Sequence, residues 1–303
     1  MARALSTLLE GGSFFEGPRW HDGRWWVSDF YRHAVFTVTE DGSASEVLKV
    51  AGQPSGLGWM PDGSMLIVSM RTRELLRWSP GGDGSGSVAV HADLSSLAPS
   101  LLNDMVVDAA GRAYVGNFGF DFNAGEEAAT TVLIRVDPDG SAVVAASDLV
   151  FPNGTVITPD GSTLIVGESF ACRYTAFSIA EDGSLTDRRV WAQLAPSPPI
   201  GPMTEMLPGL KVAPDGCCLD AEGHIWSADA VGGRAIRIAP DSSIVDEVPG
   251  PAGQAVFACM LGGASGRTLL LCAAPDSSEA RRSEGRDAVL LTAEVDVPHA
   301  GLP

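Results

Sequence analysis

Acidic and amide side chains, whose oxygens can bind a cation, recur at one position of a repeated sequence unit. The unit is a small polar residue, a short apolar run, a turn ending in glycine and a second apolar run, as in residues 153–166. Aligned on this unit, the chain brings into register Glu16, Ser55, Asn103, Asn153, Asp215 and, in the weakest copy, Ala258. A single Asn or Asp often only stabilises a turn, but four acidic or amide residues in one register favour a shared role. Two carboxylates that meet would repel each other, and a hard divalent cation with oxygen ligands would offset that repulsion.

The spacing of the copies predicts the fold. They begin at intervals of roughly 40 to 60 residues, which is typical of a radial repeat. Each copy has the pattern of a hairpin around an Asp-Gly-type turn, and third strands are expected at 34–38, 132–136 and 174–179. We therefore predict an all-β fold, a six-bladed β-propeller with four strands per blade, as one domain over residues 1–303. An open sandwich is the alternative, and the fixed register disfavours it.

The organisation of the blades follows from the copies. A strand at residues 5–9 precedes the first copy, and we expect it to pair with 288–292 and close the ring. The expected blades are 16–50, 51–98, 99–149, 150–196, 211–250 and 251–303. Residues 195–213 contain too many prolines for a strand and are predicted to be an insertion overhanging Asp215, whereas 275–287 are expected to be an outer loop. Inner strands of a propeller begin at one rim of its channel, so the residues in register should converge there.

Composition and charge narrow the function classes. The chain has 45% hydrophobic and 19% charged residues, and its net charge of −18 disfavours nucleic acid and anionic membranes as partners. The sequence shows no apolar run of membrane-spanning length and no secretory signal, and its five cysteines have no scaffold spacing. We expect a cytoplasmic protein, a monomer or weak homo-oligomer, that acts on a small molecule. Since no His or Cys stands in the register, a structural tetrahedral zinc site is disfavoured.

Four segments carry a resemblance to a known family: 16–18, 103–104, 152–154 and 214–226. Over nearly the whole chain the sequence resembles the regucalcin/gluconolactonase/luciferin-regenerating enzyme family. That resemblance implies a six-bladed propeller that holds one divalent metal ion through Glu16, Asn153 and Asp215. It also implies that Asn103 lies beside the metal and contacts substrate or water, and that the protein opens lactones. Calcium is the expected ion, although zinc, manganese and iron(II) tolerate the same ligands.

One departure from the family concerns the substrate. Sugar-lactone members of the family carry Arg two residues before the asparagine that corresponds to Asn103, whereas this chain has Leu101. The segment 116–122 is aromatic and should return to the same rim, although these aromatics alternatively cover blade edges. The predicted substrate-binding residues are Leu101, Asn103, Phe118, Phe120, Asp121 and Phe170, with Met70 and Phe122 as further apolar surface. We therefore expect an apolar or aromatic substituent on the substrate rather than a sugar acid.

The resulting hypothesis is a metal-dependent lactonase in which Asp215 is both ligand and general base and Asn103 orients the water or the carbonyl. Two alternatives remain: an organophosphate or other ester hydrolase on the same site, and a non-catalytic calcium-binding or small-ligand-binding propeller. The segment 167–171 imitates the nucleophile elbow of serine hydrolases, but that elbow requires a helix to follow, and here the sequence continues into a strand.

Overall fold

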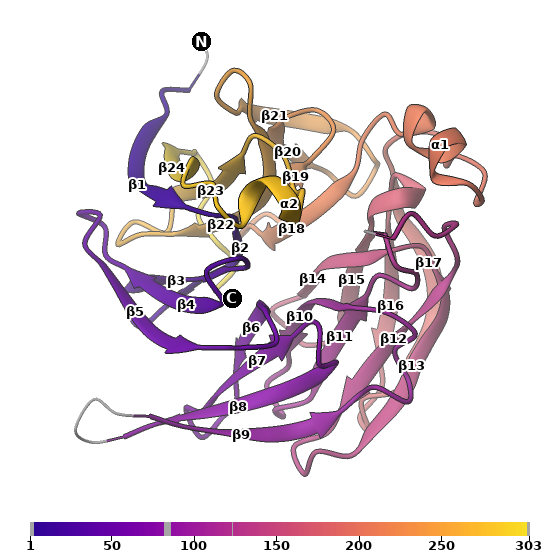
Figure 1. Cartoon of the computed structure of the whole chain (residues 1–303). Coiled ribbons are helices and arrows are strands. Elements are labelled where there is room, and N and C mark those ends of the chain that lie inside the picture. Colours follow the sequence, from indigo (N-terminus) through magenta and orange to yellow (C-terminus); the bar gives the residue numbers. More distant parts are fainter. Residues whose placement is uncertain (1–2, 82–85, 123, 302–303) are drawn as a thin grey trace.

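The strands of the computed structural model, which describes residues 3–81, 86–122 and 124–301, form six four-stranded antiparallel sheets around a common axis (Figure 1). The predicted six-bladed β-propeller is therefore confirmed, and so are the third strands expected from the sequence. The first strands of neighbouring blades contact one another around a closed ring, which makes them the inner strands.

Blades one to five each consist of four consecutive strands. From inner to outer these are β2 (Phe15–His21), β3 (Arg24–Asp29), β4 (Ala34–Val38) and β5 (Ala44–Lys49); β6 (Pro54–Trp59), β7 (Met65–Ser69), β8 (Glu74–Pro80) and β9 (Gly86–Asp93); β10 (Leu102–Val107), β11 (Ala113–Asn117), β12 (Thr131–Val136) and β13 (Ala142–Leu149); β14 (Pro152–Ile157), β15 (Thr163–Glu168), β16 (Arg173–Ile179) and β17 (Leu185–Gln193); β18 (Pro214–Leu219), β19 (Ile225–Asp229), β20 (Arg234–Ile238) and β21 (Ile244–Pro249).

The sixth blade combines strands from distant parts of the sequence. Its strands are β22 (Ala255–Gly262), β23 (Thr268–Ala274), β24 (Ala288–Glu294) and, outermost, β1 (Ser6–Gly12). β1 pairs antiparallel with β24, from Ser6 opposite Thr292 to Gly12 opposite Ala288. The predicted closure of the ring by the first strand is confirmed.

A β-bulge includes the register residue in four inner strands, β6, β10, β14 and β18, whereas in β2 the bulge follows Glu16, which pairs with Ser28. In β6, Pro54 pairs with Ser69 and Leu57 with Ile67, so that two residues oppose one. The same pattern occurs in β10, β14 and β18. Bulges of this kind re-aim a side chain and are common beside functional sites.

The sixth blade departs from this pattern. Only Phe257 stands between Val256 and Ala258, which pair with the adjacent residues Ala273 and Cys272. Its bulge is therefore one residue shorter than the others, and the sequence alignment placed the register one residue too late. Phe257 lines the cavity at the end of the channel, whereas Ala258 lies where a Cβ on Gly216 would collide with it.

Glycines after the register position allow the inner strands to approach one another. A Cβ added to Gly17 would lie 2.6 Å from the carbonyl oxygen of Ser55, and one added to Gly56 would lie 2.6 Å from the backbone nitrogen of Met105. Gly154 and Gly216 meet the next inner strand in the same way. A residue with a Cβ at these positions would force neighbouring blades apart.

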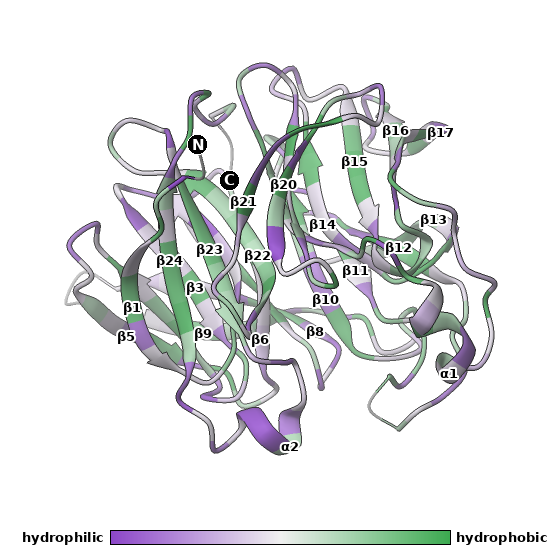
Figure 2. Ribbon diagram, turned by 90° about the horizontal axis from the view of Figure 1, so that it is seen from above, coloured by the Kyte–Doolittle hydropathy of each residue, from purple (hydrophilic) through white to green (hydrophobic). Residues whose placement is uncertain are grey.

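Short helical segments lie between the strands. They are η1 (Ser169–Ala171), α1 (Met203–Met206), η2 (Leu207–Gly209) and α2 (Glu279–Arg282). Residues 195–213 contain no strand, as expected, and α1 and α2 project on the same side of the ring (Figure 2). Among the described residues, no helix has the length and apolar character required to span a bilayer.

We expect Gly56→Ala to lower the free energy of unfolding by about 1–3 kcal/mol, because the methyl group would overpack the junction between two inner strands. Gly201→Ala is the matched control, since a Cβ there meets nothing within 4 Å. Denaturant unfolding of both variants measures the difference. Equal stability of the two variants would contradict this account of the ring.

Candidate functional site

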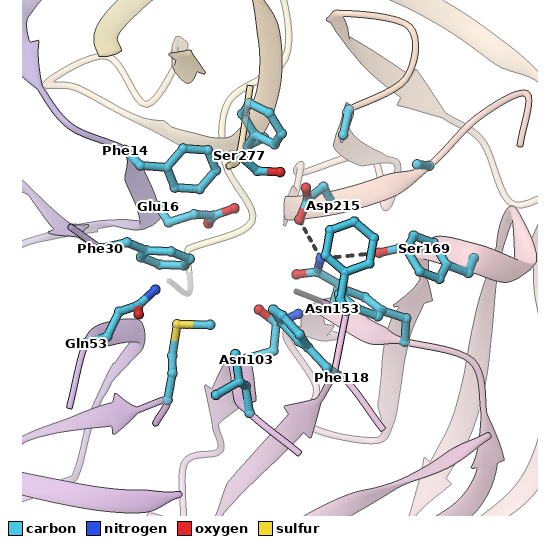
Figure 3. A pocket seen from close by; sticks show the side chains of 18 of the residues that line it. Phe14, Glu16, Phe30, Gln53, Asn103, Phe118, Asn153, Ser169, Asp215 and Ser277 are labelled. Atoms are coloured by element: carbon cyan, nitrogen blue, oxygen red, sulfur yellow. Dashed lines mark hydrogen bonds between the residues drawn. The ribbon is translucent and has the colours of Figure 1, made fainter. Parts of the chain in front are cut away.

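A cavity of about 160 Å³ opens at the rim where the inner strands begin, with room for one small molecule (Figure 3). It brings together most of the residues predicted from the sequence, namely Glu16, Leu101, Asn103, Phe118, Asn153, Phe170 and Asp215, together with Met70 and Phe122. Residues from five different blades therefore meet at one place, as the register predicts.

Besides Ala258, three predicted or aligned residues are not among those that line the cavity. Phe120 is buried behind it, with its ring centroid 6.0 Å from that of Phe170. Asp121 is exposed, and its side chain accepts a hydrogen bond from the backbone of Ala124. Ser55 is buried within the ring of inner strands. The sequence pattern does not determine the direction of side chains in the turn after β11, and this explains the first two differences.

The amide group of Asn153 has a determined orientation. Its Nδ2 donates to Oδ1 of Asp215 at 2.5 Å and to Oγ of Ser169 at 3.2 Å. The Ser169 hydroxyl donates to the carbonyl oxygen of Pro214 at 2.6 Å, so it must accept from Asn153. The side-chain oxygen of Asn153 is thus turned away from these partners and remains available as a ligand (Figure 3).

Asn103 is held in a similar way, because its Nδ2 donates to the carbonyl oxygen of Pro152 at 3.4 Å. Its side-chain oxygen has no hydrogen-bond partner among the described residues. Two amide oxygens and two carboxylates therefore gather in one cavity, and all of them are acceptors.

The two carboxylates experience an unfavourable environment for negative charge. Burial raises the pKa of Glu16, and the charge of Asp215 raises it further. Burial is also the main cause of the raised pKa of Asp215. The described residues that line the cavity include no Lys, Arg or His.

The donor atoms of the cavity match those of a site for a hard metal ion. The described residues contain no cluster of three His, Cys, Asp or Glu side chains suited to a metal. The donors here are two carboxylates and two amide oxygens, which is the ligand type that hard divalent cations prefer. A cation at this position would offset the repulsion between the two carboxylates and would bind the amide oxygens that lack hydrogen-bond partners.

A buried ion pair lies deeper in the ring of inner strands. Nη2 of Arg19 is 2.6 Å from Oδ1 of Asp104, and both side chains are almost fully buried. Arg19 also donates to the carbonyl oxygens of Pro18 and Met105. Since its guanidinium is paired with Asp104, it only partly offsets the charge of Glu16. Nothing in the sequence pattern predicts this pair.

Acidic residues at the ends of second strands position the segments that lead into the inner strands. Asp29 accepts a hydrogen bond from the backbone nitrogen of Ser13 at 2.9 Å. Glu168 accepts one from Val150 at 2.9 Å, and Asp229 accepts one from Ala213 at 3.1 Å. These residues are absent from the predicted site, although the recurrence of an acid after the second apolar run is visible in the sequence.

Two further sets of positions repeat around the cavity. The residues two positions before the register are Phe14, Gln53, Leu101, Phe151 and Ala213, and those directly after the second strands are Phe30, Met70, Phe118, Ser169 and Ala230. All of them line the cavity. The sequence-based prediction included Leu101 but did not extend its position to the other blades.

Aromatic rings form two walls of the cavity. On one side Phe118 stacks on Phe151 at a centroid distance of 4.4 Å, and Phe151 stacks on Phe170 at 4.6 Å. On the other side Phe14 lies 4.7 Å from Phe257, and Phe30 lies 5.2 Å from Phe14. The cavity therefore combines a polar end with largely apolar sides.

The segment 275–287 is not the outer loop expected from the sequence. Ser277 lines the cavity, and its carbonyl oxygen accepts a hydrogen bond from the hydroxyl of Tyr31 at 2.7 Å. On the other side of the cavity, Met206 and Leu210 of the 195–213 insertion pack against the cluster that contains Phe151 and Phe170.

A six-bladed propeller with acidic and amide residues converging at one end of its channel defines the class of protein. The chain belongs to the SMP-30/Gluconolactonase/LRE-like family, whose model matches residues 14–275. The resemblance recognised in the sequence is therefore confirmed.

The sequence identities to individual relatives are low. The chain is 26% identical to pentonolactonase XacC of Haloferax volcanii over 100% of this chain and 96% of that protein. It is 28% identical to 6-deoxy-6-sulfogluconolactonase of Pseudomonas putida, but this match spans only 60% of the chain and 56% of the relative's length. The fold is similar to that of regucalcin from Agrobacterium tumefaciens, with a TM-score of 0.80, 21% identity and coverage of 100% and 97% of the two chains.

The raised pKa values of Glu16 and Asp215 predict how the metal-free protein responds to pH. In the unfolded chain both groups titrate near pH 4, whereas the folded state retains their protons to higher pH. The contribution of these two groups to the free energy of unfolding should therefore be fully present below about pH 4. It should fall as the pH rises towards the folded pKa values, by about 1.4 kcal/mol per pH unit for each group.

Melting temperatures of chelated protein between pH 5 and 8 measure this trend, and Asp215→Asn should flatten it. A constant or rising melting temperature in the wild type would contradict the prediction.

Proposed function

We propose that this protein is a divalent-metal-dependent hydrolase that opens a lactone bearing an apolar or aromatic group. The observation that carries the proposal is the convergence of Glu16, Asp215 and Asn153 in one cavity whose described lining has no cationic side chain. Family membership supports the reaction type, since relatives are named pentonolactonase, gluconolactonase and L-arabinolactonase.

In this proposal Glu16, Asn153 and Asp215 hold the cation. Calcium is the proposed ion because the donors are all oxygens and because the regucalcin from Agrobacterium tumefaciens is described as calcium-binding. When bound, such an ion polarises the lactone carbonyl and lowers the pKa of a coordinated water. Ser169 maintains the orientation of Asn153 that leaves its oxygen free for this role.

Two side chains act on the attacking water in this proposal. Asp215 accepts the proton of the attacking water, and the Asn103 oxygen accepts a hydrogen bond that orients this water or a substrate group. Burial raises the pKa of Asp215 in the metal-free protein, whereas a bound cation would lower it, so this role is proposed from the position of Asp215 in the cavity.

The apolar substituent is proposed from the cavity walls. The stacked rings of Phe118, Phe151 and Phe170 face Phe14, Phe30 and Phe257 across the site. Leu101 offers no donor to a sugar hydroxyl, and an unpaired buried hydroxyl costs about 1–3 kcal/mol.

Exhaustive chelation should abolish lactone hydrolysis and lower the melting temperature at pH 7.5, and calcium should restore both. Aryl, alkyl and sugar lactones with a pH indicator provide the assay, and metal analysis of protein purified without added ions identifies the ion. Turnover by demonstrably metal-free protein would contradict the metal requirement. Calcium-dependent stabilisation without turnover of any lactone or ester would instead favour a calcium-binding protein, and the regucalcin from Agrobacterium tumefaciens is described as one.

Asp215→Asn should reduce kcat about 10²-fold or more while metal content largely survives, because the amide retains an oxygen ligand but accepts no proton at neutral pH. Glu247→Gln, on the outer strand of the same blade, is the control. Loss of the metal together with activity would leave Asp215 as a ligand only, and unchanged kcat with bound metal would exclude it as the base.

Leu101→Arg should shift the ratio of kcat/KM towards gluconolactone and away from an aryl lactone, because arginine donates several hydrogen bonds to hydroxyls. Two or three newly paired hydroxyls correspond to a change of about 10²-fold in the ratio. Both substrates are measured on one preparation of each protein. A wild-type preference for gluconolactone would contradict the apolar-substituent proposal.

A further inference from the structure

We infer that Gln53 is a specificity-determining residue that donates a hydrogen bond to the substrate, so that the preferred lactone carries a hydrogen-bond acceptor, such as an ether or carbonyl oxygen, on its otherwise apolar part. The lactone reaction rests on the proposed function, whereas recognition by Gln53 is argued from the cavity itself. Gln53 lines the cavity together with Met70 and Phe30.

The orientation of the Gln53 amide is fixed by Arg71. Nε of Arg71 donates to Oε1 of Gln53 at 2.6 Å. Arginine has donors but no acceptor, so the amide oxygen must face it and the NH₂ group must point the other way. Figure 3 shows this nitrogen turned towards the cavity.

The NH₂ group of Gln53 has no hydrogen-bond partner in the described part of the protein and is accessible from the cavity. Gln53 is 4% exposed, and its Nε2 makes no hydrogen bond to any residue in the described part of the chain. Water in the cavity can reach this nitrogen, so a ligand that brings an acceptor would replace that water at an oriented donor. The other side-chain amides of the cavity, those of Asn103 and Asn153, already donate to protein atoms.

The backbone fixes the position of Gln53 on the cavity wall. Its φ of 70° lies in the left-handed region, which is unfavourable for a residue with a Cβ. Its nitrogen donates to the carbonyl oxygen of Val50, and its own carbonyl oxygen accepts from the nitrogen of Met70, so two hydrogen bonds hold it there. Phe151, at the same position of blade four, also has a positive φ, of 55°, so this conformation belongs to the turn before the inner strand and places both side chains on the cavity wall.

The surroundings make Gln53 distinctive. Among the five positions two residues before the register, the other four carry Phe, Leu, Phe and Ala. Arg71 also forms an ion pair with Glu279 of α2, whose Oε2 lies 2.5 Å from Nη2 of Arg71. The segment 275–287 therefore helps to hold Arg71, and through it the amide of Gln53. The site therefore presents one oriented donor on apolar sides.

The binding test uses ligands that cannot be hydrolysed. 3-Phenylcyclopentanone and its three methoxyphenyl isomers are titrated calorimetrically into calcium-loaded wild type, and at least one isomer should bind about tenfold more tightly than the parent. Gln53→Met, which removes the donor, should abolish this preference, so that the methoxyphenyl isomers bind no more tightly than the parent. Gln53→Gly, which also relieves the backbone strain, should give the same loss if Gln53→Met folds poorly.

Substitution of Arg71 tests whether the orientation of the Gln53 amide determines which ligands bind. In Arg71→Met the amide is free to rotate and to present its oxygen, so hydroxyphenyl isomers should gain affinity relative to methoxyphenyl isomers by several-fold. Arg73→Met is the matched control, because Arg73 donates to the carbonyl oxygen of Ala98 instead. No change in this ratio in Arg71→Met would overturn the role of Arg71.

The corresponding aryl lactones distinguish this inference from the proposed function. If the wild type binds the ketones with the expected preference but hydrolyses no lactone, the proposed function fails and the role of Gln53 stands. If lactones are hydrolysed but Gln53→Met alters the parent and methoxy substrates equally, or neither, the role of Gln53 is overturned. Equal binding of all ketones by the wild type, or binding of none, also overturns it.

Discussion

The close approach of neighbouring inner strands is the constraint on which the rest of the structure depends. Glycines such as Gly56 and Gly154 lie against the backbone of the next inner strand, where no Cβ would fit. The bulges at the same places point the preceding residue towards the axis. The ring thus brings into one cavity side chains that are far apart in the sequence, such as Glu16 and Asp215, which are 199 positions apart.

Electrostatic properties of the cavity follow from the same geometry. Convergence of equivalent positions gathers like charges, and here the charge of Asp215 adds to burial in raising the pKa of Glu16. The nearby guanidinium of Arg19 is paired with Asp104 and leaves this cost largely in place. With an overall charge of −18, the protein has a field that attracts cations towards the site.

The sequence reveals the fold and the polar end of the site because both depend on a repeat that can be counted. Turn glycines eight residues after the register fix the hairpins, and Gly63, Gly161 and Gly223 do adopt positive φ. It does not reveal roles that depend on which atoms meet in space. Asp29 and Glu168 look like ordinary turn residues until their backbone partners are known, and Phe257 is displaced by a bulge one residue shorter than expected.

The pairing of β1 with β24 has a consequence for how the protein reaches its native state. Ser6 and Thr292 are partners across almost the whole sequence, so the sixth blade is completed only after the other five have been synthesised. Such contacts raise the contact order and slow folding. Until this closure, the edges of β1 and β24 remain unpaired and prone to association with other chains. A circular permutant that places β1 directly after β24 would make the last blade local in sequence, and its refolding would lose this late step.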